Sequence, residues 1–192
     1  MYPSVSKADI RRQLRARRSA LSRHERTACA EAAAAILTRS SYWRDADTIA
    51  LYLAADGELD TDPIIRTARA ANKRLFLPVI LPDNSLQFRQ WRADMDLVVN
   101  RYGIPEPAKT ANSAELSALT LVCVPLVAWD RQGTRLGMGG GFYDRTFAGA
   151  GSRGLLVGLG YTIQEQASLP RDTWDVSLDL VVTESDLISC QR

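Results

Sequence analysis

Five apolar segments recur along the chain, and they constrain its fold more than any other feature of the sequence. They read TIALYLA (48–54), RLFLPVI (74–80), ALTLVCVPLVAW (118–129), GLLVGLG (154–160) and LDLVVTE (178–184). Each is expected to contain a buried β-strand. Several are apolar at successive positions rather than at alternate ones, which indicates a sheet that is covered on both faces.

Helices are expected between these strands. Ser6 is placed to cap a first helix, and SRHE (22–25) has the form of a capping box that opens a second, alanine-rich helix running to about residue 38. The Thr-Asp-Pro sequence at 61–63 opens another helix that ends near Asn72, and a further helix begins near Phe142.

The alternation of strands and helices predicts an α/β fold. We expect a single three-layer α/β/α domain over residues 1–192, with a central mostly parallel or mixed sheet and the N-terminal helices packed on it. LQFRQW (86–91) is expected to add a short strand, residues 100–111 to form a loop, and 178–184 to be the last strand.

The composition is that of a soluble globular protein, with 46% hydrophobic and 24% charged residues. No apolar run approaches the roughly 18 residues of a membrane span, and the N-terminal segment lacks the apolar region of a secretory signal, so we expect a cytoplasmic protein. The three cysteines are scattered without a CxxC pair, which favours reduced thiols over disulfides or a zinc site. The single histidine, His24, is expected on the surface, which argues against catalytic triads.

Charge is distributed unevenly along the chain. Residues 7–26 carry a net charge of +6, whereas the rest of the chain carries −4. Ile10, Leu14 and Leu21 fall on one face of the predicted first helix, and Arg18 is expected elsewhere with the other arginines. A basic arm on a mildly acidic body indicates an anionic partner, and nucleic acid, a nucleotide or a polyanionic small molecule would each fit.

The segment RLGMGGGFYD (135–144) is the strongest candidate for a functional site. We expect it to follow the strand at 120–127 and to precede a helix, the place where open α/β sheets bind ligands. Glycines there expose N–H groups to phosphate oxygens, and the helix N-terminus adds partial positive charge. Arg135 can donate two charge-assisted hydrogen bonds to a phosphate, and the Asp144 carboxylate is a suitable ligand for Mg²⁺. Phe142 and Tyr143 can form the wall of a pocket for a planar ring. A plain tight turn is the alternative, because neither a Walker A loop nor a complete GxGxxG fingerprint is present.

Two further acidic segments border strands. AADGELDTDP (54–63) holds Asp56 and Glu58, and WDVSLD (174–179) holds Asp175. Taken alone, the first is most simply a solvated loop and the second says little. Core or rim packing, rather than stacking on a ligand, is expected of the four tryptophans, Trp43, Trp91, Trp129 and Trp174.

The segment VPLVAWDRQGTRLGMGGGFYDRTF (124–147) closely resembles the signature of the 5-formyltetrahydrofolate cyclo-ligases, also called 5,10-methenyltetrahydrofolate synthetases. The resemblance covers nearly the full chain, and the glycine segment is its most specific part. The remaining motifs fall in the family's order and are Lys7-x-x-x-Arg11, LAADGELDT (53–61), GIPEP (103–107) and LDLVVTE (178–184).

This resemblance implies an enzyme that uses ATP and Mg²⁺ to convert 5-formyltetrahydrofolate into 5,10-methenyltetrahydrofolate, with release of ADP and phosphate. The formyl oxygen is phosphorylated, and N10 then attacks the activated carbon. Such a reaction is accelerated mainly by positioning the two substrates and neutralising the charge of the phosphates, so no protein nucleophile is required. A monomer is favoured over an oligomer, although the sequence does not give the oligomeric state. A polyglutamate tail on the folate would give the basic arm an anionic partner.

The resemblance also assigns roles to residues. Arg135 and Glu58 are implied as catalytic, and the Glu58 carboxylate would accept the N–H donors of the pterin. Asp144, with Asp175, would hold Mg²⁺. The implied ATP contacts are Lys7, Arg11, Arg135, Leu136, Gly137, Met138, Gly139, Gly140, Gly141, Phe142 and Tyr143. The implied folate contacts are Leu53, Glu58, Met138, Gly139, Gly140, Gly141 and Phe142.

Two other functions stay open on the sequence alone. An RNA-binding protein would explain the basic N-terminal helices, but it would not explain the glycine segment with Asp144. Another enzyme on a similar scaffold, such as a sugar-phosphate isomerase or a CoA transferase, would share the fold class. The order of the motifs favours the cyclo-ligase over this second alternative.

Overall fold

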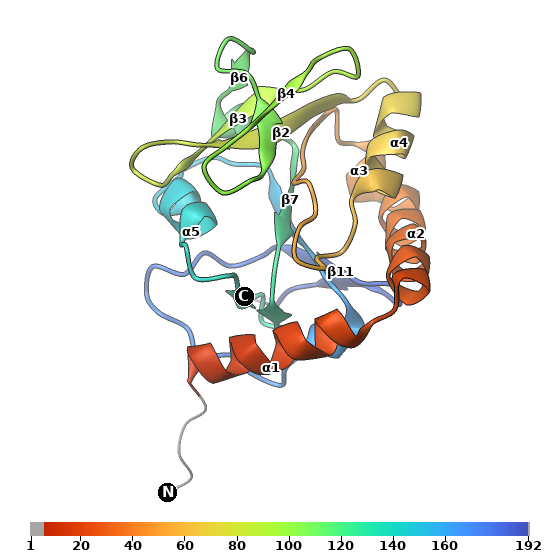
Figure 1. Ribbon diagram of the computed structural model, residues 1–192, viewed down its shortest axis with the longest axis vertical. Coiled ribbons are helices and arrows are strands. Elements are labelled where there is room, and N and C mark those ends of the chain that lie inside the picture. The colour runs from red at the N-terminus through yellow and green to blue at the C-terminus, as the bar shows by residue number, and fades with distance from the viewer. Residues whose placement is uncertain (1–5, 192) are drawn as a thin grey trace, which may run out of the picture.

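The computed structural model describes residues 6–191 and has short strands joined by helices and hairpins (Figure 1). The helices are α1 (Lys7–Ala20), α2 (Arg23–Arg39), α3 (Ser41–Arg44), α4 (Asp62–Ala70) and α5 (Phe142–Phe147), with short 3-10 helices at Leu116–Ala118 and Thr162–Gln164. The strands are β1 (Thr48–Ala50), β2 (Arg74–Ile80), β3 (Leu86–Gln90), β4 (Leu97–Val99), β5 (Pro105–Pro107), β6 (Ser113–Ala114), β7 (Leu121–Pro125), β8 (Ala128–Trp129), β9 (Arg135–Leu136), β10 (Leu155–Leu159), β11 (Leu180–Val182) and β12 (Leu187–Ser189).

Eight of the strands described for residues 6–191 form one mixed sheet in the order β12-β11-β10-β7-β1-β2-β3-β6. The pairs from β11 through β10, β7 and β1 to β2 are parallel. Antiparallel strands complete both sides, with β12 next to β11 and with β3 and β6 beyond β2. The predicted α/β class with a mixed central sheet is confirmed.

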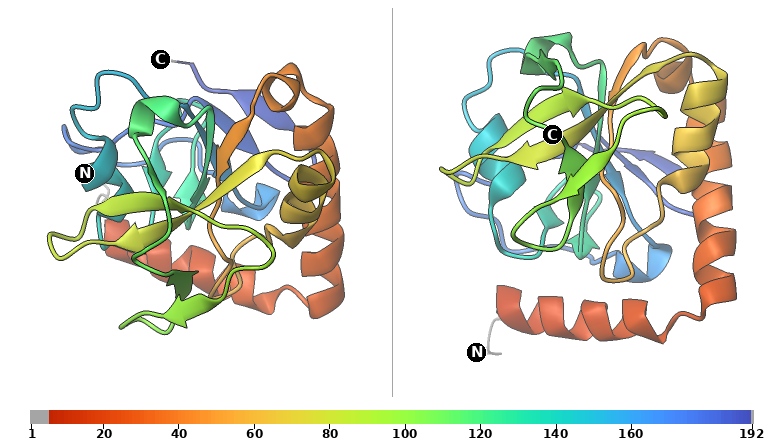
Figure 2. Two further views of the ribbon diagram at one scale, coloured as in Figure 1. Left: turned by 90° about the horizontal axis from the view of Figure 1, so that it is seen from above. Right: turned by 45° about the horizontal axis from the view of Figure 1, so that its top comes forward.

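Apolar cores lie on both faces of this sheet. Along β7, Leu121 and Cys123 share a core with residues of α2 and α4, whereas Val122 and Val124 share a second core with Phe147 of α5. Figures 1 and 2 show α2 and α4 on one side of the sheet and α5 on the other. Successive side chains of a strand point to opposite faces, so a strand that is covered on both sides has to be apolar at every position.

The predicted helix starts are confirmed. Ser6 Oγ accepts a hydrogen bond from the Asp9 N–H at 3.1 Å, and Ser22 and Glu25 form the reciprocal bonds of a capping box. Helix α4 has Pro63 in its first turn and ends at Ala70, slightly before the predicted end. At Ser6 and Ser22 the cap side chains accept hydrogen bonds from N–H groups that have no partner within the helix. Thr61 makes no such bond at the start of α4, where Pro63 instead removes one N–H that would lack a partner.

Helix α1 lies across one end of the sheet rather than on either face (Figures 1 and 2). Ile10 and Leu14 pack against Val127, which lies between β7 and β8, and against Leu136 of β9. They also pack against Leu169, which follows the 3-10 helix at Thr162–Gln164. The basic arm is therefore held at the end of the sheet where β7 finishes.

Three predictions about the connections are wrong. Residues 100–111 contain β5, which pairs with β4 and is held in part by a hydrogen bond of 3.0 Å from the Asn100 side chain to Glu106. Strand β12 follows the predicted last strand. A β8–β9 hairpin follows β7, and its second strand holds the first two residues of the glycine segment. Strands of two or three residues are too short to show a periodic pattern in the sequence.

Replacing Leu14 with alanine is expected to lower the free energy of unfolding by about 2–5 kcal/mol, because this buried side chain holds α1 on the β8–β9 hairpin. Chemical denaturation followed by circular dichroism measures the change. Gln13→Ala, on the exposed side of α1, is the matched control and is expected to shift the value by less than about 0.5 kcal/mol. Equal stability of Leu14→Ala and the wild type would contradict this docking of α1.

Candidate active site

A cavity of about 810 Å³ opens where α1 crosses the end of the sheet. Its walls come from α1, the loop after β1, the β4–β5 hairpin, the glycine segment and the loop before β11. The structure brings all the candidate site residues of the sequence analysis to this one cavity. They are Lys7, Arg11, Leu53, Glu58, Arg135, Leu136, Gly137, Met138, Gly139, Gly140, Gly141, Phe142, Tyr143, Asp144 and Asp175.

The glycine segment forms one wall of the cavity, and its glycines differ in what they contribute. Gly139 has a φ of 104°, in the left-handed region that side chains disfavour. A Cβ on Gly140 would collide with the ring of Phe142. A Cβ on Gly137 would meet nothing within 4 Å, so packing does not require glycine there. The absence of a side chain at Gly137 instead leaves bare backbone facing the cavity.

The helix after the glycine segment contributes less than the sequence suggested. Helix α5 has only six residues, Phe142–Phe147, so it aligns few peptide dipoles behind the cavity. The charges that face a ligand therefore come mainly from side chains, namely those of Lys7, Arg11, Arg135 and Arg145.

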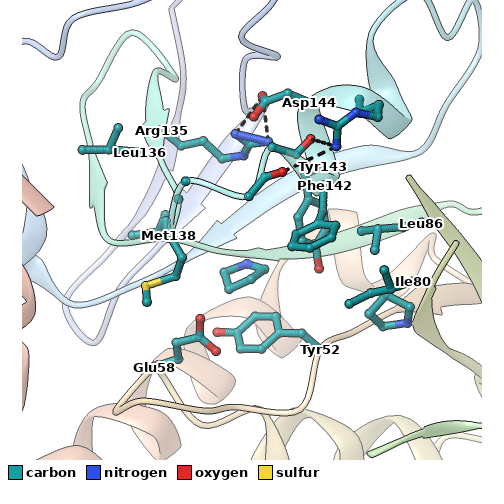
Figure 3. A pocket seen from close by; sticks show the side chains of 18 of the residues that line it. Tyr52, Glu58, Ile80, Leu86, Arg135, Leu136, Met138, Phe142, Tyr143 and Asp144 are labelled. Carbon is teal, nitrogen blue, oxygen red and sulfur yellow. Dashed lines mark hydrogen bonds and ion pairs between the residues drawn. The ribbon is translucent and has the colours of Figure 1, made fainter. Parts of the chain in front are cut away.

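Arg135 and Asp144 form a largely buried ion pair in the cavity wall (Figure 3). Both Nη atoms of Arg135 donate to Asp144 Oδ1, at 3.0 and 2.9 Å, and the Val176 N–H donates to the same oxygen at 3.0 Å. The two side chains are 5% and 21% exposed. Burial lowers the pKa of Arg135, and the Asp144 carboxylate opposes that shift. Arginine nevertheless stays protonated in proteins, so the pair fixes a cation in the wall.

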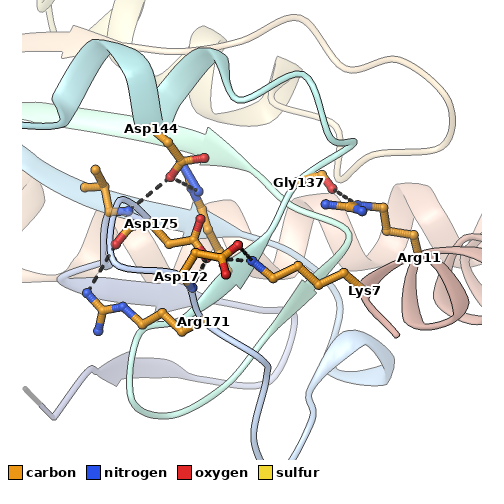
Figure 4. Close-up of polar contacts among 9 residues, drawn as sticks. Lys7, Arg11, Gly137, Asp144, Arg171, Asp172 and Asp175 are labelled. Carbon is orange, nitrogen blue, oxygen red and sulfur yellow. Dashed lines mark hydrogen bonds and ion pairs between the residues drawn. The ribbon is translucent and has the colours of Figure 1, made fainter. Parts of the chain in front are cut away.

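Lys7 and Arg11 reach from α1 to two other walls of the cavity (Figure 4). Lys7 Nζ donates to Asp172 Oδ2 at 2.7 Å and to Asp175 Oδ2 at 2.8 Å, and Arg11 Nε donates to the Gly137 carbonyl at 2.8 Å. Burial disfavours the charged form of Lys7, but its two carboxylate partners outweigh burial and raise its pKa. Burial also opposes ionisation of Asp175, yet the Asp172 N–H and Lys7 lower the pKa of Asp175.

Asp144 and Asp175 line the same cavity, and each has an oxygen bonded to a basic side chain. Within residues 6–191, no group of three or more histidine, cysteine, aspartate or glutamate side chains is arranged to hold a metal ion. Mg²⁺ at nucleotide sites takes one or two protein carboxylates and completes its shell with phosphate oxygens and water. This donor set therefore fits Mg²⁺ that arrives with a nucleotide better than a metal held by the protein alone.

The loop after β1 carries Glu58 into the cavity near Tyr52 (Figure 3). Glu58 Oε2 accepts the Ala55 N–H at 3.1 Å, and Tyr52 donates its hydroxyl to the Leu59 carbonyl at 2.8 Å. Burial raises the pKa of Glu58, while the Ala55 N–H and the charge of Arg18 oppose that shift. A carboxylate that is partly withdrawn from water in this way is well suited to bind N–H donors of a ligand.

Arg18 contradicts the expectation that it lies away from the apolar face of α1. It is only 1% exposed, because it follows Leu14 by one turn and therefore shares its face. It donates to the Asp56 carbonyl at 2.6 Å, to Asp56 Oδ2 at 2.9 Å and to the Leu126 carbonyl at 3.4 Å. This arginine is consequently removed from any surface that would bind RNA, whereas His24 is exposed as expected.

Sequence reasoning missed several residues of the cavity. Trp174 was expected to pack, but it is 65% exposed at the cavity. Tyr102 also lines the cavity, and its ring centre lies 6.0 Å from that of Phe142 in an edge-to-face arrangement. Exposed aromatic rings beside a cavity are available to contact a planar ligand. Asp172 could have been proposed from the sequence, because it lies three residues before Asp175, which was already a candidate. Tyr102 could not, because it belongs to a segment that was predicted to be a plain loop.

Comparison with known proteins identifies the family. The chain matches the 5-formyltetrahydrofolate cyclo-ligase family over residues 3–184. The chain belongs to this family. A 5-formyltetrahydrofolate cyclo-ligase of Haemophilus influenzae is 38% identical over 176 residues, which cover 89% of this chain and 92% of the relative. That of Escherichia coli strain K12 is 42% identical over 144 residues, which cover 73% and 79%.

A solved structure agrees with this assignment. The NMR structure of Aquifex aeolicus 5,10-methenyltetrahydrofolate synthetase aligns with a TM-score of 0.84 and 30% sequence identity, covering 97% of this chain and 93% of that one. Family membership makes the chain an enzyme, a ligase of folate metabolism. The comparisons give no support to the RNA-binding alternative. Among residues 6–191, no helix has the length and apolar character needed to cross a membrane.

Replacing Asp144 with asparagine is expected to lower the free energy of unfolding by about 3 kcal/mol, because it leaves the buried Arg135 cation without its counter-charge. Denaturant unfolding measures the loss. The matched control is Asp172→Asn, which removes a more exposed carboxylate of the same cavity and is expected to shift the value by less than about 1 kcal/mol. Equal losses in the two variants would argue against a special role of the Arg135–Asp144 pair.

Proposed function

We propose that this enzyme converts 5-formyltetrahydrofolate into 5,10-methenyltetrahydrofolate, uses ATP with Mg²⁺, and releases ADP and phosphate. The observation that carries the proposal is the convergence of a bare glycine segment, basic side chains and a half-buried glutamate on one cavity. Its volume of about 810 Å³ lies in the upper part of the range of about 300–1,000 Å³ for small-molecule sites, as suits a site for two substrates. The family match over residues 3–184 supports a single domain.

We assign ATP to the end of the cavity formed by Lys7, Arg11 and residues 135–143. Backbone N–H groups beside Gly137 and the cations of Lys7, Arg11 and Arg135 suit phosphate oxygens. Arg135 has five N–H donors, and the pair with Asp144 occupies one hydrogen on each Nη, so donors remain for a phosphate. Mg²⁺, held by Asp144 and Asp175, would supply neutralisation of phosphate charge.

We assign the folate to the end formed by Leu53, Glu58, Met138 and Phe142, together with the glycine backbone between the last two. Glu58 accepts N–H donors of the pterin, and the partial burial of its carboxylate strengthens such bonds. Exposed apolar side chains nearby, including Met138, can cover the faces of the ring. The two assigned ends share the glycine segment, so this arrangement brings the formyl group next to the phosphates.

The proposed chemistry needs positioning more than covalent help from the protein. The formyl oxygen forms a bond to the γ-phosphorus while the bond from that phosphorus to the ADP oxygen breaks. The N10 lone pair then forms the new bond to the formyl carbon, and the N10 proton passes to water. The carbon–oxygen bond breaks with its electron pair going to the oxygen of the departing phosphate. Arg135 and the nearby cations stabilise the charge on the transferring group, and Glu58 holds the pterin in register.

Purified protein incubated with 5-formyltetrahydrofolate, ATP and Mg²⁺ is expected to develop the absorbance of a methenyl folate, with one ADP formed per product. The reason is that phosphate must first be placed on the formyl oxygen to make it a leaving group. Mixtures that lack ATP or Mg²⁺ are the controls and should stay without product. Folded protein that makes no product in the complete mixture would show that the proposed reaction is wrong.

The kcat/KM for the folate is expected to fall as the pH is lowered through the pKa of Glu58, which burial places above its ordinary value of 4.5. The protonated carboxyl accepts fewer N–H donors than the carboxylate, so affinity is lost on the acidic side. Glu58→Gln should show a lower value without this titration, while its affinity for ATP stays near that of the wild type. A wild-type profile that stays flat down to pH 4.5 would contradict the role of Glu58.

A further inference from the structure

Arg18 is among the largest fully buried side chains of the described residues, and it is charged. It belongs to α1, but its hydrogen bonds go to two other segments: the carbonyl and carboxylate of Asp56, and the Leu126 carbonyl after β7. Its Nε is buried without a hydrogen-bond partner among residues 6–191. A buried polar group with an unmet donor calls for an explanation.

Stability does not explain this arginine. Removing a guanidinium from water carries a penalty that an ion pair often fails to offset, and apolar replacements of buried ion pairs are often neutral or stabilising. The partner carboxylate of Asp56 is 44% exposed and also has Arg15 as a partner, so water and a second cation already screen it. An apolar side chain of similar length would fill the space but would not bind the loop at Asp56.

The loop that Arg18 holds has a demanding backbone. Asp56 and Gly57 have φ values of 49° and 74°, and left-handed backbone is uncommon for a residue other than glycine. Such conformations persist where neighbouring contacts hold them. Glu58 follows directly, and its N–H donates to the Ala55 carbonyl at 2.9 Å while its carboxylate accepts the Ala55 N–H. The orientation of Glu58 thus depends on the turn at 55–58, which Arg18 secures.

The same helix reaches the other end of the cavity. Lys7 and Arg11 lie in the first turns of α1, and Arg18 lies in its last turn. A helix of 14 residues is a stiff element, so contacts at one end constrain the position of the other. Contacts of Lys7 and Arg11 with a phosphate would fix the position of α1, and Arg18 would in turn fix the position of the 55–58 turn.

We propose that Arg18 is a positioning residue that couples the nucleotide end of the cavity to the folate end by tying the 55–58 turn to α1. This inference rests on the proposed function and deepens it. Binding of the nucleotide fixes α1, α1 fixes the turn, and the turn fixes Glu58. Each substrate then raises the affinity of the enzyme for the other by the same factor.

Calorimetric titrations test this coupling. The affinity for 5-formyltetrahydrofolate is measured with and without Mg²⁺ and a non-hydrolysable ATP analogue, in the wild type and in Arg18→Met. The analogue is expected to raise the folate affinity of the wild type roughly tenfold and that of Arg18→Met hardly at all. In turnover assays, Arg18→Met should raise the KM for folate roughly tenfold, as for the loss of a charge-assisted hydrogen bond, while kcat changes little.

Two variants separate positioning from general damage. Arg17→Met changes the neighbouring exposed arginine of α1 and should keep the wild-type KM and coupling. Arg18→Lys keeps a cation but cannot bond Asp56 and Leu126 together, so its KM and coupling should fall between those of the wild type and Arg18→Met. The unfolding midpoint of Arg18→Met should match or exceed that of the wild type, which a purely structural role would not allow.

The outcomes are distinct. Unchanged folate KM and coupling in Arg18→Met would overturn the inference, and if that variant does not fold, the same result in Arg18→Lys would do so. Absence of coupling in the wild type would overturn it as well. A wild type that binds and couples both ligands but makes no methenyl folate would instead refute the proposed reaction and support the coupling.

Discussion

Burial of the parallel strands on both faces is the constraint on which the rest of this structure depends. Strands β1, β7 and β10 carry apolar side chains toward two cores, so chemically active groups have no place on the faces of the sheet. Such groups collect in the loops at the strand ends. The turn with Asp56 and Glu58 follows β1, and the hairpin and glycine segment follow β7. The cavity lies where ligands of open α/β sheets bind.

Helix α1 completes that cavity from outside the sheet. Its apolar residues dock on the β8–β9 hairpin, and its basic residues Lys7, Arg11 and Arg18 each bond a different wall. The amphipathic pattern of α1 therefore serves both to dock the helix and to place basic side chains at the cavity. The apolar side supplies the stability of docking. Lys7 and Arg11 present cations at the cavity, and Arg18 holds the turn at Asp56.

The segments with strong local signals were the ones that sequence reasoning located. Ser6, the capping box at Ser22 and Pro63 begin helices through contacts within a few residues, and the structure has helices at all three places. The glycine segment was also recognisable, because its residues lie together in sequence. The β4–β5 pair, the β8–β9 hairpin and β12 were missed, since their short strands are defined by pairing partners rather than by their own pattern.

The sequence by itself determined the class of fold, the starts of the helices and the family, because periodicity, caps and a contiguous motif are all local properties of the chain. Tertiary structure alone decided that Arg18 is buried and bonded to Asp56, that Trp174 is exposed at the cavity, and that Lys7 meets Asp172 and Asp175. The contacts of Arg18 and Lys7 join residues far apart in the chain. Their burial and partners follow from how α1 docks across the sheet, which no local pattern records.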